Sequence, residues 1–400
     1  MKKQIFAVLM LSSLLLVGCN KDNGPKIEDL GTKDFHTDLQ QRYIDDEDWT
    51  NIKAYVPFVE ADNPTGQDRE KLLGNVSSPN AIRLEFDEVN DSENYYVQIA
   101  KNKEFEDAQQ FEVTTKYYDL YNTELGQEYY FRASNAEGGL DKAQIKKFKV
   151  SDDAPRNLNV DGVINFRDIG GWKTSLMEGA RIKQGLYYRC AQFNADNRSK
   201  SNPGLNITEK GLQTIKELNI KVDIDMRDRP LNMADEGESP RSVISTEDHP
   251  VALLDAHIAS GTESTRFSGF ADVYSAIFEK IEKADEAPIA LHCTHGADRT
   301  GIASFFLLAV LGASEEDCGR DYSFTRYAGA RKVWHEDEFD GWVSGTKAYE
   351  VDAKYDTDQY KDQKFAEQMK KHLMSKGISE DRIETIREKF IPGYARPAAA

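Results

Sequence analysis

The sequence predicts an α/β fold, in which a mostly parallel sheet is flanked by helices, preceded by a small all-β sandwich domain. Three observations lead to this prediction. The chain has 400 residues, which is more than one ordinary domain holds. Near residue 150 the hydrophobic period changes from an alternation of two residues, typical of half-buried strands, to the longer period of amphipathic helices. Beyond that point short apolar runs alternate with helical stretches, as they do in parallel sheets.

Composition limits the classes of function. Hydrophobic residues make up 39% and charged residues 30% of the chain, which is typical of a soluble globular protein with a sizeable core. The formal net charge of −18 argues against a nucleic-acid partner, because phosphate backbones need a basic surface. An anionic substrate must therefore be held by arginines that are concentrated locally.

The first 18 residues are expected to form a lipoprotein signal peptide. Lys2 and Lys3 make a basic start, and the apolar stretch 5–17 is short for a membrane span. The stretch leads into Leu-Val-Gly-Cys at residues 16–19, which resembles a bacterial lipobox. The resemblance implies cleavage before Cys19 and lipid on its sulfur, which would hold the protein at a membrane surface. We therefore expect a bacterial cell-envelope location, either periplasmic or surface-exposed.

Residues 19–71 show no sustained hydrophobic period and are expected to be a tether and irregular segment. Residues 76–152 then alternate apolar and polar positions, with turn-prone residues between the runs, which predicts an antiparallel sandwich. The expected strands cover 82–86, 95–99, 111–113, 129–133 and 148–150. The stretch from residue 120 to 133 resembles a fibronectin type III domain. No nucleophile or metal-ligand pattern stands out there, so we expect a spacer or a binding role, with a protein or glycan partner.

Residues 155–395 are expected to form the α/β domain. An amphipathic helix is predicted over 208–219, and it leads into a strand over 222–226. A second helix is expected over 267–283, followed by a strand over 288–291 and a further helix from about Arg299. Ligands of such sheets bind beyond the carboxyl ends of the strands. The loop that follows residue 291 is therefore the expected site.

That loop carries the most specific signal in the chain, His-Cys-Thr-His-Gly-Ala-Asp-Arg-Thr-Gly at residues 292–301. A loop between a strand and a helix can point N–H groups at an anion, and the helix N-terminus adds a positive dipole. Cys293 at the rim of such a loop should have a lowered pKa, and Arg299 offers a planar fork for two phosphate oxygens. The hydroxyl of Thr300 can donate to the thiolate. These groups suit phosphoryl transfer through a phosphocysteine intermediate.

A metal site is a poor alternative at this loop. His292, Cys293 and His295 are too close along the chain for one tetrahedral ion, and the sequence has no Cys-x-x-Cys pair. We expect neither a metal nor a cofactor.

The loop resembles the Cys-x5-Arg signature of protein tyrosine phosphatases. Three upstream stretches extend the resemblance to bacterial tyrosine phosphatases of tyrosine phosphatase family 3: NFRDIGG at 165–171, GLYYRCAQF at 185–193 and VDIDMRDRP at 222–230. Two C-terminal helices, over 361–375 and 379–390, fit the ending of that family. The resemblance implies a tyrosine-phosphatase-like fold and a phosphoric monoester hydrolase.

Roles for the site residues follow from this resemblance. The expected catalytic residues are Cys293, Asp298, Arg299 and Thr300. Asp298 stands immediately before the arginine, where the family has its general acid, while Asp225 and Asp228 remain alternatives. Substrate contacts are expected from Thr294, His295, Gly296, Ala297, Arg167 and Asp168. The last two residues are equally suited to be a structural ion pair that supports the loop.

Two departures from the family bear on the substrate. Ala297 stands where lysine is common, and His295 where a small residue is frequent. A missing lysine disfavours highly charged phosphoinositides and favours phosphotyrosine protein or another monoester. We therefore expect a protein tyrosine phosphatase of the cell envelope. The alternatives are a phosphatase of phosphoinositides or other small phosphomonoesters, and a catalytically silent, lipid-anchored phosphoprotein-binding module. Whether Cys190 is a redox partner of Cys293 stays open at this point.

Overall fold

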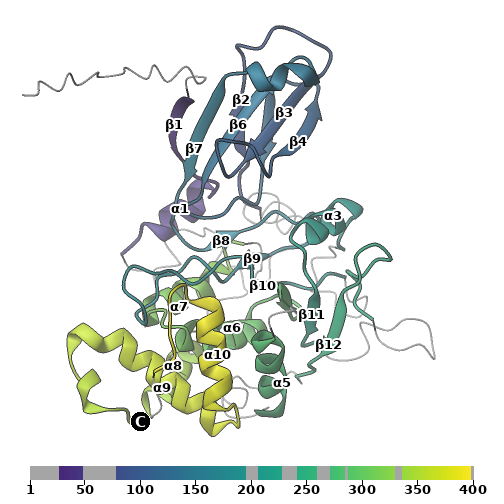
Figure 1. Cartoon of the computed structure of the whole chain (residues 1–400). Helices are drawn as coiled ribbons and strands as arrows, with labels where there is room; N and C mark the ends of the chain where they lie inside the picture. Colours follow the sequence, from purple (N-terminus) through teal and green to yellow (C-terminus); the bar gives the residue numbers. More distant parts are fainter. Residues whose placement is uncertain are drawn as a thin grey trace, which may run out of the picture.

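The computed structural model describes residues 27–47, 78–194, 206–227, 241–258, 271–283, 287–328 and 336–397. The expected signal peptide, the lipidation site Cys19 and the alternative acid Asp228 lie outside these residues. Figure 1 shows a β-rich region stacked on a larger part that contains both helices and strands. The coarse prediction of a β-rich part followed by an α/β part is confirmed.

The β-rich region contains two sheets. The larger has the order β1-β7-β6-β3-β4, and the smaller pairs β2 with β5. Leu84, Val97, Phe131 and Phe148, which come from both sheets, belong to one core cluster. The elements are β1 (Ile27–Lys33), β2 (Ile82–Glu85), β3 (Tyr95–Ala100), β4 (Gln109–Val113), β5 (Tyr117–Leu120), β6 (Glu128–Ser134), the 3-10 helix η2 (Glu137–Lys142) and β7 (Ile145–Val150).

The segment expected to be an irregular tether contains regular structure where it is described. β1 pairs in parallel with β7 at the edge of the larger sheet, and α1 (Asp38–Ile44) follows it. The side chain of Thr37 accepts a hydrogen bond from the Gln40 N–H, which caps α1. The sequence did not reveal these elements because β1 is mostly exposed and α1 is only seven residues long.

A third sheet, of six strands, carries the α/β part. It has the order β12-β11-β13-β10-β9-β8. The pairs β12–β11, β11–β13 and β13–β10 are parallel, whereas β10–β9 and β9–β8 are antiparallel, so the sheet is mixed. The strands are β8 (Arg156–Asn157), β9 (Arg167–Asp168), β10 (Tyr187–Cys190), β11 (Val222–Asp225), β12 (Ala252–Asp255) and β13 (Ile289–His292).

Helices cover both faces of this sheet. Ile215 of α3 packs with Tyr188 and Ala290 on one face, while α5, α6, α9 and α10 share the larger core cluster with Ile289 and Leu291 on the other. Every residue of α6 is buried, and after its polar first turn the helix has only one polar side chain, Ser304, which suits a helix enclosed on all sides. The helices are α3 (Glu209–Glu217), α5 (Ala271–Glu282), α6 (Asp298–Val310), α7 (Glu315–Phe324), α8 (Glu336–Lys347), α9 (Lys361–Ser375) and α10 (Glu380–Phe390), with 3-10 helices η4 (Ala353–Tyr355) and η5 (Asp358–Tyr360).

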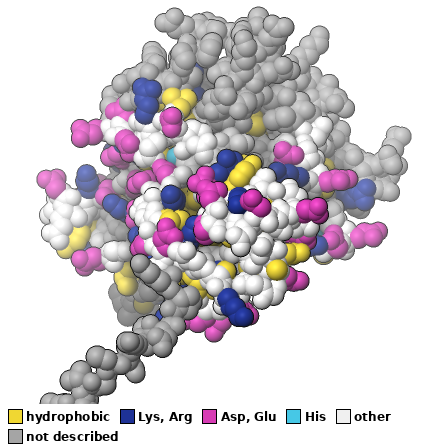
Figure 2. Space-filling view, turned by 90° about the horizontal axis from the view of Figure 1, so that it is seen from above, with side chains coloured by type: hydrophobic (Ala, Val, Ile, Leu, Met, Phe, Trp, Pro, Cys, Tyr) yellow, Lys and Arg dark blue, Asp and Glu magenta, His cyan; other side chains and the backbone are white. Residues whose placement is uncertain are grey.

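Charged side chains of both signs share the surface. In Figure 2 lysine and arginine lie among aspartate and glutamate on the described part of the face seen from above. Lys146 and Lys147 of β7, for example, pair with Glu88 at 2.9 Å and with Glu128 at 2.8 Å. No helix of the described residues is both long and apolar enough to cross a bilayer.

Arg156 joins the β-rich region to the α/β part. Its guanidinium donates to the carbonyl oxygens of Thr123 and Asn122, at 2.8 Å each, and to the carboxylate of Asp168 at 2.9 Å. Both side chains of the ion pair are buried. Burial raises the pKa of the Asp168 carboxyl, and the charge of Arg156 opposes that rise. The ion pair at this junction therefore depends on both partners.

We expect Arg156→Met to destabilise the protein by about 3–5 kcal/mol, because it leaves the buried carboxylate of Asp168 without its cation. The loss should shrink as the pH falls toward the ordinary pKa of aspartate, since a protonated Asp168 needs no partner. Urea unfolding at several pH values measures both effects. Arg83→Met is the control, because its ion pair with Asp119 is exposed and its removal should change stability little. Equal losses for the two variants would contradict the prediction.

Candidate active site

The phosphate loop, which we define as residues 293–299, begins where β13 ends. β13 lies between β11 and β10, and Cys293 follows its last residue, so the cysteine sits at the carboxyl end of parallel strands. Asp298 and Arg299 are the first two residues of α6. Most of the loop is buried, and only Thr294 and His295 are partly exposed. The buried residues are Cys293, Gly296, Ala297, Asp298 and Arg299, and Thr300 of the helix is buried too. The structure thus brings the cysteine and the arginine together at the N-terminus of a buried helix.

Gly296 is required by the path of the loop. Its φ of +66° lies in the left-handed region that disfavours side chains. A Cβ atom there would also lie 2.3 Å from the carbonyl oxygen of Cys190. The loop therefore packs directly against the end of β10. The Gln192 N–H adds a hydrogen bond of 3.3 Å to the Thr294 carbonyl oxygen.

The environment of Cys293 favours the thiolate. The sulfur is buried, and burial together with the charge of Asp298 would raise its pKa. The charge of Arg299, together with the nearby hydroxyl and backbone N–H of Thr300, outweighs both effects, so the pKa of Cys293 lies below that of an ordinary thiol. A lowered pKa increases the thiolate fraction near neutral pH, and the thiolate is the nucleophilic form.

Arg299 is held by the ends of the neighbouring strands. Its Nη1 donates to the carbonyl oxygens of Met226 at 2.9 Å and Ile258 at 3.1 Å, residues that follow β11 and β12. Its Nη2 lies 3.4 Å from Oγ1 of Thr294. These contacts fix the guanidinium beside Cys293, where its positive charge acts on the sulfur.

The N-terminus of α6 contributes a positive dipole to the loop. Ala297 occupies the N-cap position and makes no side-chain hydrogen bond to the helix. The N–H groups of a first helical turn have no partner within the helix and bind anions. A serine or aspartate at the N-cap would accept hydrogen bonds from these N–H groups and so compete with an anion. Alanine cannot, so it leaves the N–H groups to a ligand.

Two side chains hold the outer edge of the phosphate loop. Nδ2 of Asn165 donates to the carbonyl oxygens of His295 and Gly296, at 3.0 Å each. Nη2 of Arg189 donates to the same Gly296 oxygen at 2.8 Å. A loop whose carbonyl oxygens are held from outside keeps its N–H groups for an anion. Asn165 itself has a φ of +58°, a conformation that asparagine tolerates better than most residues.

Arg167 and Asp168 belong to separate ion pairs, and only Arg167 is linked to the loop, through Asn165. Nε of Arg167 lies 3.0 Å from Asp321, and its Nη1 donates to the side chain of Asn165. Asp168 pairs with Arg156 and accepts from the N–H groups of Gly170 and Gly185. Arg167 and Asp168 are both fully buried. Each has its own protein partner, Asp321 for Arg167 and Arg156 for Asp168, so the expected ion pair between the two is not formed.

Behind the cysteine lies a buried cluster of charges. Nε2 of His292 is 3.0 Å from Asp223 and 3.7 Å from Asp225, whose charges raise the pKa of His292 against the effect of burial. Asp225 is also bound by Arg227 at 2.6 Å. Burial would raise the pKa of Asp225, but His292 and Arg227 hold it far below its usual range. A carboxylate held ionised in this way is poorly suited to be the general acid.

Cys190 and Cys293 lie on opposite faces of the sheet. Cys190 is in register with His292 and packs in the core cluster of Tyr188 and Ala290. Cys293 belongs to the cluster on the other face. Burial also raises the pKa of Cys190 well above the ordinary value, which keeps it a thiol. The arrangement argues against Cys190 as a redox partner of Cys293.

Three supporting residues were missed by the sequence analysis. Asn165 and Arg189 lie inside stretches that were recognised, but nothing in the sequence shows that their side chains reach the loop. Asp321 accepts from both Arg167 and Arg189 and lies on α7, where it is one acid among several. Within the described ranges, no group of three or more histidine, cysteine and acidic residues is arranged to hold a metal ion.

The chain belongs to the tyrosine phosphatase family. The family model described as tyrosine phosphatase family matches residues 158–392, which is more than half of the chain. By its family the protein is therefore a phosphotyrosine-phosphatase-like hydrolase. None of the curated proteins matches it.

Two solved structures of Pseudomonas aeruginosa TpbA show a distant likeness. The crystal structure of TpbA is 16% identical, covers 46% of this chain and 92% of its own chain, and has a TM-score of 0.28. The structure of a cysteine-to-serine TpbA variant in complex with phosphotyrosine is also 16% identical, covers 43% and 94%, and has a TM-score of 0.23. At these scores the likeness carries none of the functional argument.

We expect Thr300→Val to make Cys293 less reactive at neutral pH. Valine keeps the shape of threonine but cannot donate to the thiolate, so the pKa of Cys293 should rise. The rate of alkylation by iodoacetate should then fall several-fold near pH 7 and reach its plateau at higher pH. Measuring the rate against pH tests this, and Cys293→Ser verifies which thiol reacts. An unchanged profile would show that Thr300 does not stabilise the thiolate.

Proposed function

We propose that the protein is a cysteine-dependent phosphatase of phosphotyrosine proteins that works through a phosphocysteine intermediate. The observation that carries this proposal is the setting of Cys293. Its pKa is lowered by Arg299 and Thr300 at the N-terminus of α6, in a loop held open from outside by Asn165 and Arg189. A nucleophile, an anion site and a fixed guanidinium therefore meet at one place.

The first chemical step transfers the phosphoryl group to the enzyme. The sulfur of Cys293 forms a bond to phosphorus while the bond from phosphorus to the tyrosyl oxygen breaks. The N–H groups of the loop and the guanidinium of Arg299 bind the three outer oxygens and stabilise the charge that they carry in the transition state. Asp298 in its acid form gives its proton to the leaving tyrosyl oxygen.

The second step releases phosphate. Water attacks the phosphorus of the phosphocysteine and gives a proton to the carboxylate of Asp298, and the bond from sulfur to phosphorus breaks. Hydrogen bonds that the hydroxyl and N–H of Thr300 can donate favour the thiolate that leaves. Asp298 suits both steps because it lies at the N-terminus of α6, close enough to Cys293 for its charge to affect the pKa of the thiol. Asp225 is occupied by Arg227 and His292.

Two features support phosphotyrosine as the substrate. Cys293 is only 2% exposed, so a substrate must reach down to it, which a long phosphoaryl side chain does better than phosphoserine. Ala297 adds no positive charge to the loop, which disfavours highly phosphorylated lipids. His295, which is partly exposed, is the residue that could still favour a phosphoinositide or another small monoester when protonated.

The location at the cell envelope and the role of the β-rich region are part of the proposal. The lipobox-like stretch before Cys19 supports a lipid anchor, and residues 19–26 would lead from it to β1. The two sheets share a core, which supports a fibronectin type III-like sandwich. None of the residues proposed for catalysis lies in its strands. We infer that this region spaces the active site from the membrane or binds a protein or glycan.

Turnover separates this proposal from a catalytically silent binding module. Wild type should release phosphate from an aryl phosphate, and Cys293→Ser should abolish release because it removes the nucleophile. A wild-type protein that binds phosphotyrosine peptide without releasing phosphate would support the binding module. Phosphotyrosine peptides and phosphoinositides, compared by kcat/KM on the same preparation, decide between the two substrate classes.

We expect Asp298→Asn to lower kcat on a phosphotyrosine peptide by about 10²–10⁴-fold, the usual contribution of a positioned general acid. The loss should be much smaller on an aryl phosphate with an acidic phenol, because that leaving group departs without a proton. Steady-state kinetics on both substrates tests the prediction, with Asp228→Asn as the control for an acid from a distant loop. Equal losses on both substrates would assign Asp298 to binding or to loop structure. A leaving-group-dependent loss in Asp228→Asn alone would move the role there.

A further inference from the structure

We propose that α1, which precedes the segment matched by the family, is a positioning element of the active site. It holds the segment 320–328, which we call the support segment, so that this segment in turn holds the residues around the phosphate loop. The inference rests on the proposed function and adds a requirement to it: residues of the N-terminal segment take part in shaping the anion site. Three sets of contacts carry it.

The first set joins α1 to the support segment. The ring of Tyr43 stacks on Tyr327 with centroids 4.5 Å apart, and its hydroxyl meets Oγ of Ser323. Nε2 of Gln40 donates to the carbonyl oxygen of Tyr327 at 3.1 Å. Gln40 and Tyr43 are fully buried although α1 is short. The packed face of α1 is thus occupied by the support segment.

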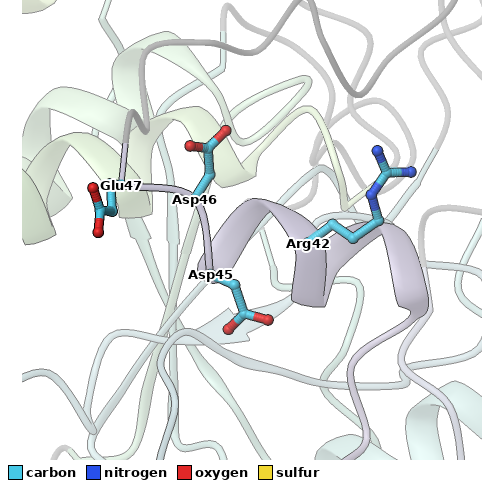
Figure 3. Close-up of a pocket in the computed structure, with 4 residues that line it drawn as sticks. All are labelled: Arg42, Asp45, Asp46 and Glu47. Atoms are coloured by element: carbon cyan, nitrogen blue, oxygen red, sulfur yellow. The ribbon is translucent and has the colours of Figure 1, made fainter.

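The second set fixes the C-terminal end of α1. Arg320 donates to the carbonyl oxygens of Tyr43 at 3.2 Å, Ile44 at 3.3 Å and Asp46 at 2.5 Å. A cation at this position suits the negative end of a helix. Figure 3 shows the side chains of Arg42, Asp45, Asp46 and Glu47 pointing in different directions around the pocket that they line. They do not converge on a common point, so this pocket makes no ion site, and the backbone contacts are the ones that matter.

The third set joins the other side of the support segment to the active site. Asp321 accepts from Arg167 and Arg189, and the Ala328 carbonyl oxygen accepts from the Asn165 N–H at 2.8 Å. Arg189 and Asn165 are the two residues that hold the carbonyl oxygens of the phosphate loop. The contacts therefore run from α1 to the support segment, from there to Arg189 or Asn165, and from each of these two residues to the phosphate loop.

The geometry explains why such a helix would matter for activity. Stabilisation of a phosphoryl-transfer transition state depends on donors that are already in place, and small displacements weaken it. α1 is itself tied to the β-rich region, because β1 pairs with β7 and the Asn80 side chain donates to the His36 carbonyl oxygen at 3.0 Å. Figure 1 shows α1 between the β-rich region and α7.

The test uses the full chain with Tyr43→Ala, Gln40→Ala and the milder Tyr43→Phe. Asp38→Asn is the matched control, because Asp38 lies on the exposed side of the same helix. The measurements are the melting temperature, the affinity for tungstate by calorimetry, kcat and KM on an aryl phosphate, and hydrogen exchange of peptides that contain residues 293–299. We expect Tyr43→Ala, which loses the stacked ring and the hydroxyl contact, to bind tungstate about three- to tenfold more weakly. Gln40→Ala, which loses the bond to Tyr327 and the bond from the Thr37 N–H, should bind it about two- to fivefold more weakly. Exchange of the loop should be faster in both.

A role in stability alone would give a different result. If Tyr43→Ala and Gln40→Ala lower the melting temperature but keep the tungstate affinity, kcat and loop exchange of Asp38→Asn, the proposal is overturned. If Tyr43→Ala does not fold, Gln40→Ala and Tyr43→Phe decide by the same comparison. Loop exchange needs neither binding nor turnover. Wild type that shows no hydrolysis would therefore count against the proposed function, while the exchange comparison still decides the role of α1.

Discussion

The buried carboxylate of Asp321 is the interaction on which the active site depends most widely. It receives the guanidinium groups of Arg167 and Arg189, both of which are fully buried. Burial would raise the pKa of Asp321, but the two arginines lower it below the ordinary value. The pKa of Arg167 is lowered to about 10 by burial and by Arg189, which still leaves it charged at neutral pH. Two cations share one anion, and removing that anion would leave both uncompensated in the interior.

This arrangement separates the arginine proposed to bind the substrate from those that shape the site. Arg299 is the arginine that borders Cys293, and its Nη1 is held by strand-end carbonyl oxygens. Arg167 and Arg189 pair with the buried Asp321. They also donate to the side chain of Asn165 and to the carbonyl oxygen of Gly296, respectively. An overall charge of −18 repels an anion at long range, so attraction must come from the local field of the loop, the α6 dipole and Arg299. A phosphate group would therefore be attracted only within the short range of these groups.

The parts of the chain outside the family segment are joined to it by specific contacts. Arg156 links the β-rich region to Asp168. Nε2 of His36 lies 2.9 Å from the carbonyl oxygen of Pro155. α1 packs against the segment that carries Asp321. Such contacts give the chain before residue 158 a way to affect the phosphate loop. In the proposed lipid-anchored form, this junction would lie between the anchor and the active site.

Most of what the sequence determined is local along the chain. Cys293, Gly296, Arg299 and Thr300 lie within eight consecutive positions, so the strand, the loop and the helix that position them could be predicted together. Asp321 bonds to Arg167 across 154 positions, and Gln40 bonds to Tyr327 across 287. Sequence pattern cannot reveal such pairs, because a buried carboxylate on α7 looks like its exposed neighbours until the fold brings the arginines to it. The sequence thus determined the chemistry of the loop, while the tertiary structure decided which residues hold it in shape, since burial and long-range contact exist only in the folded chain.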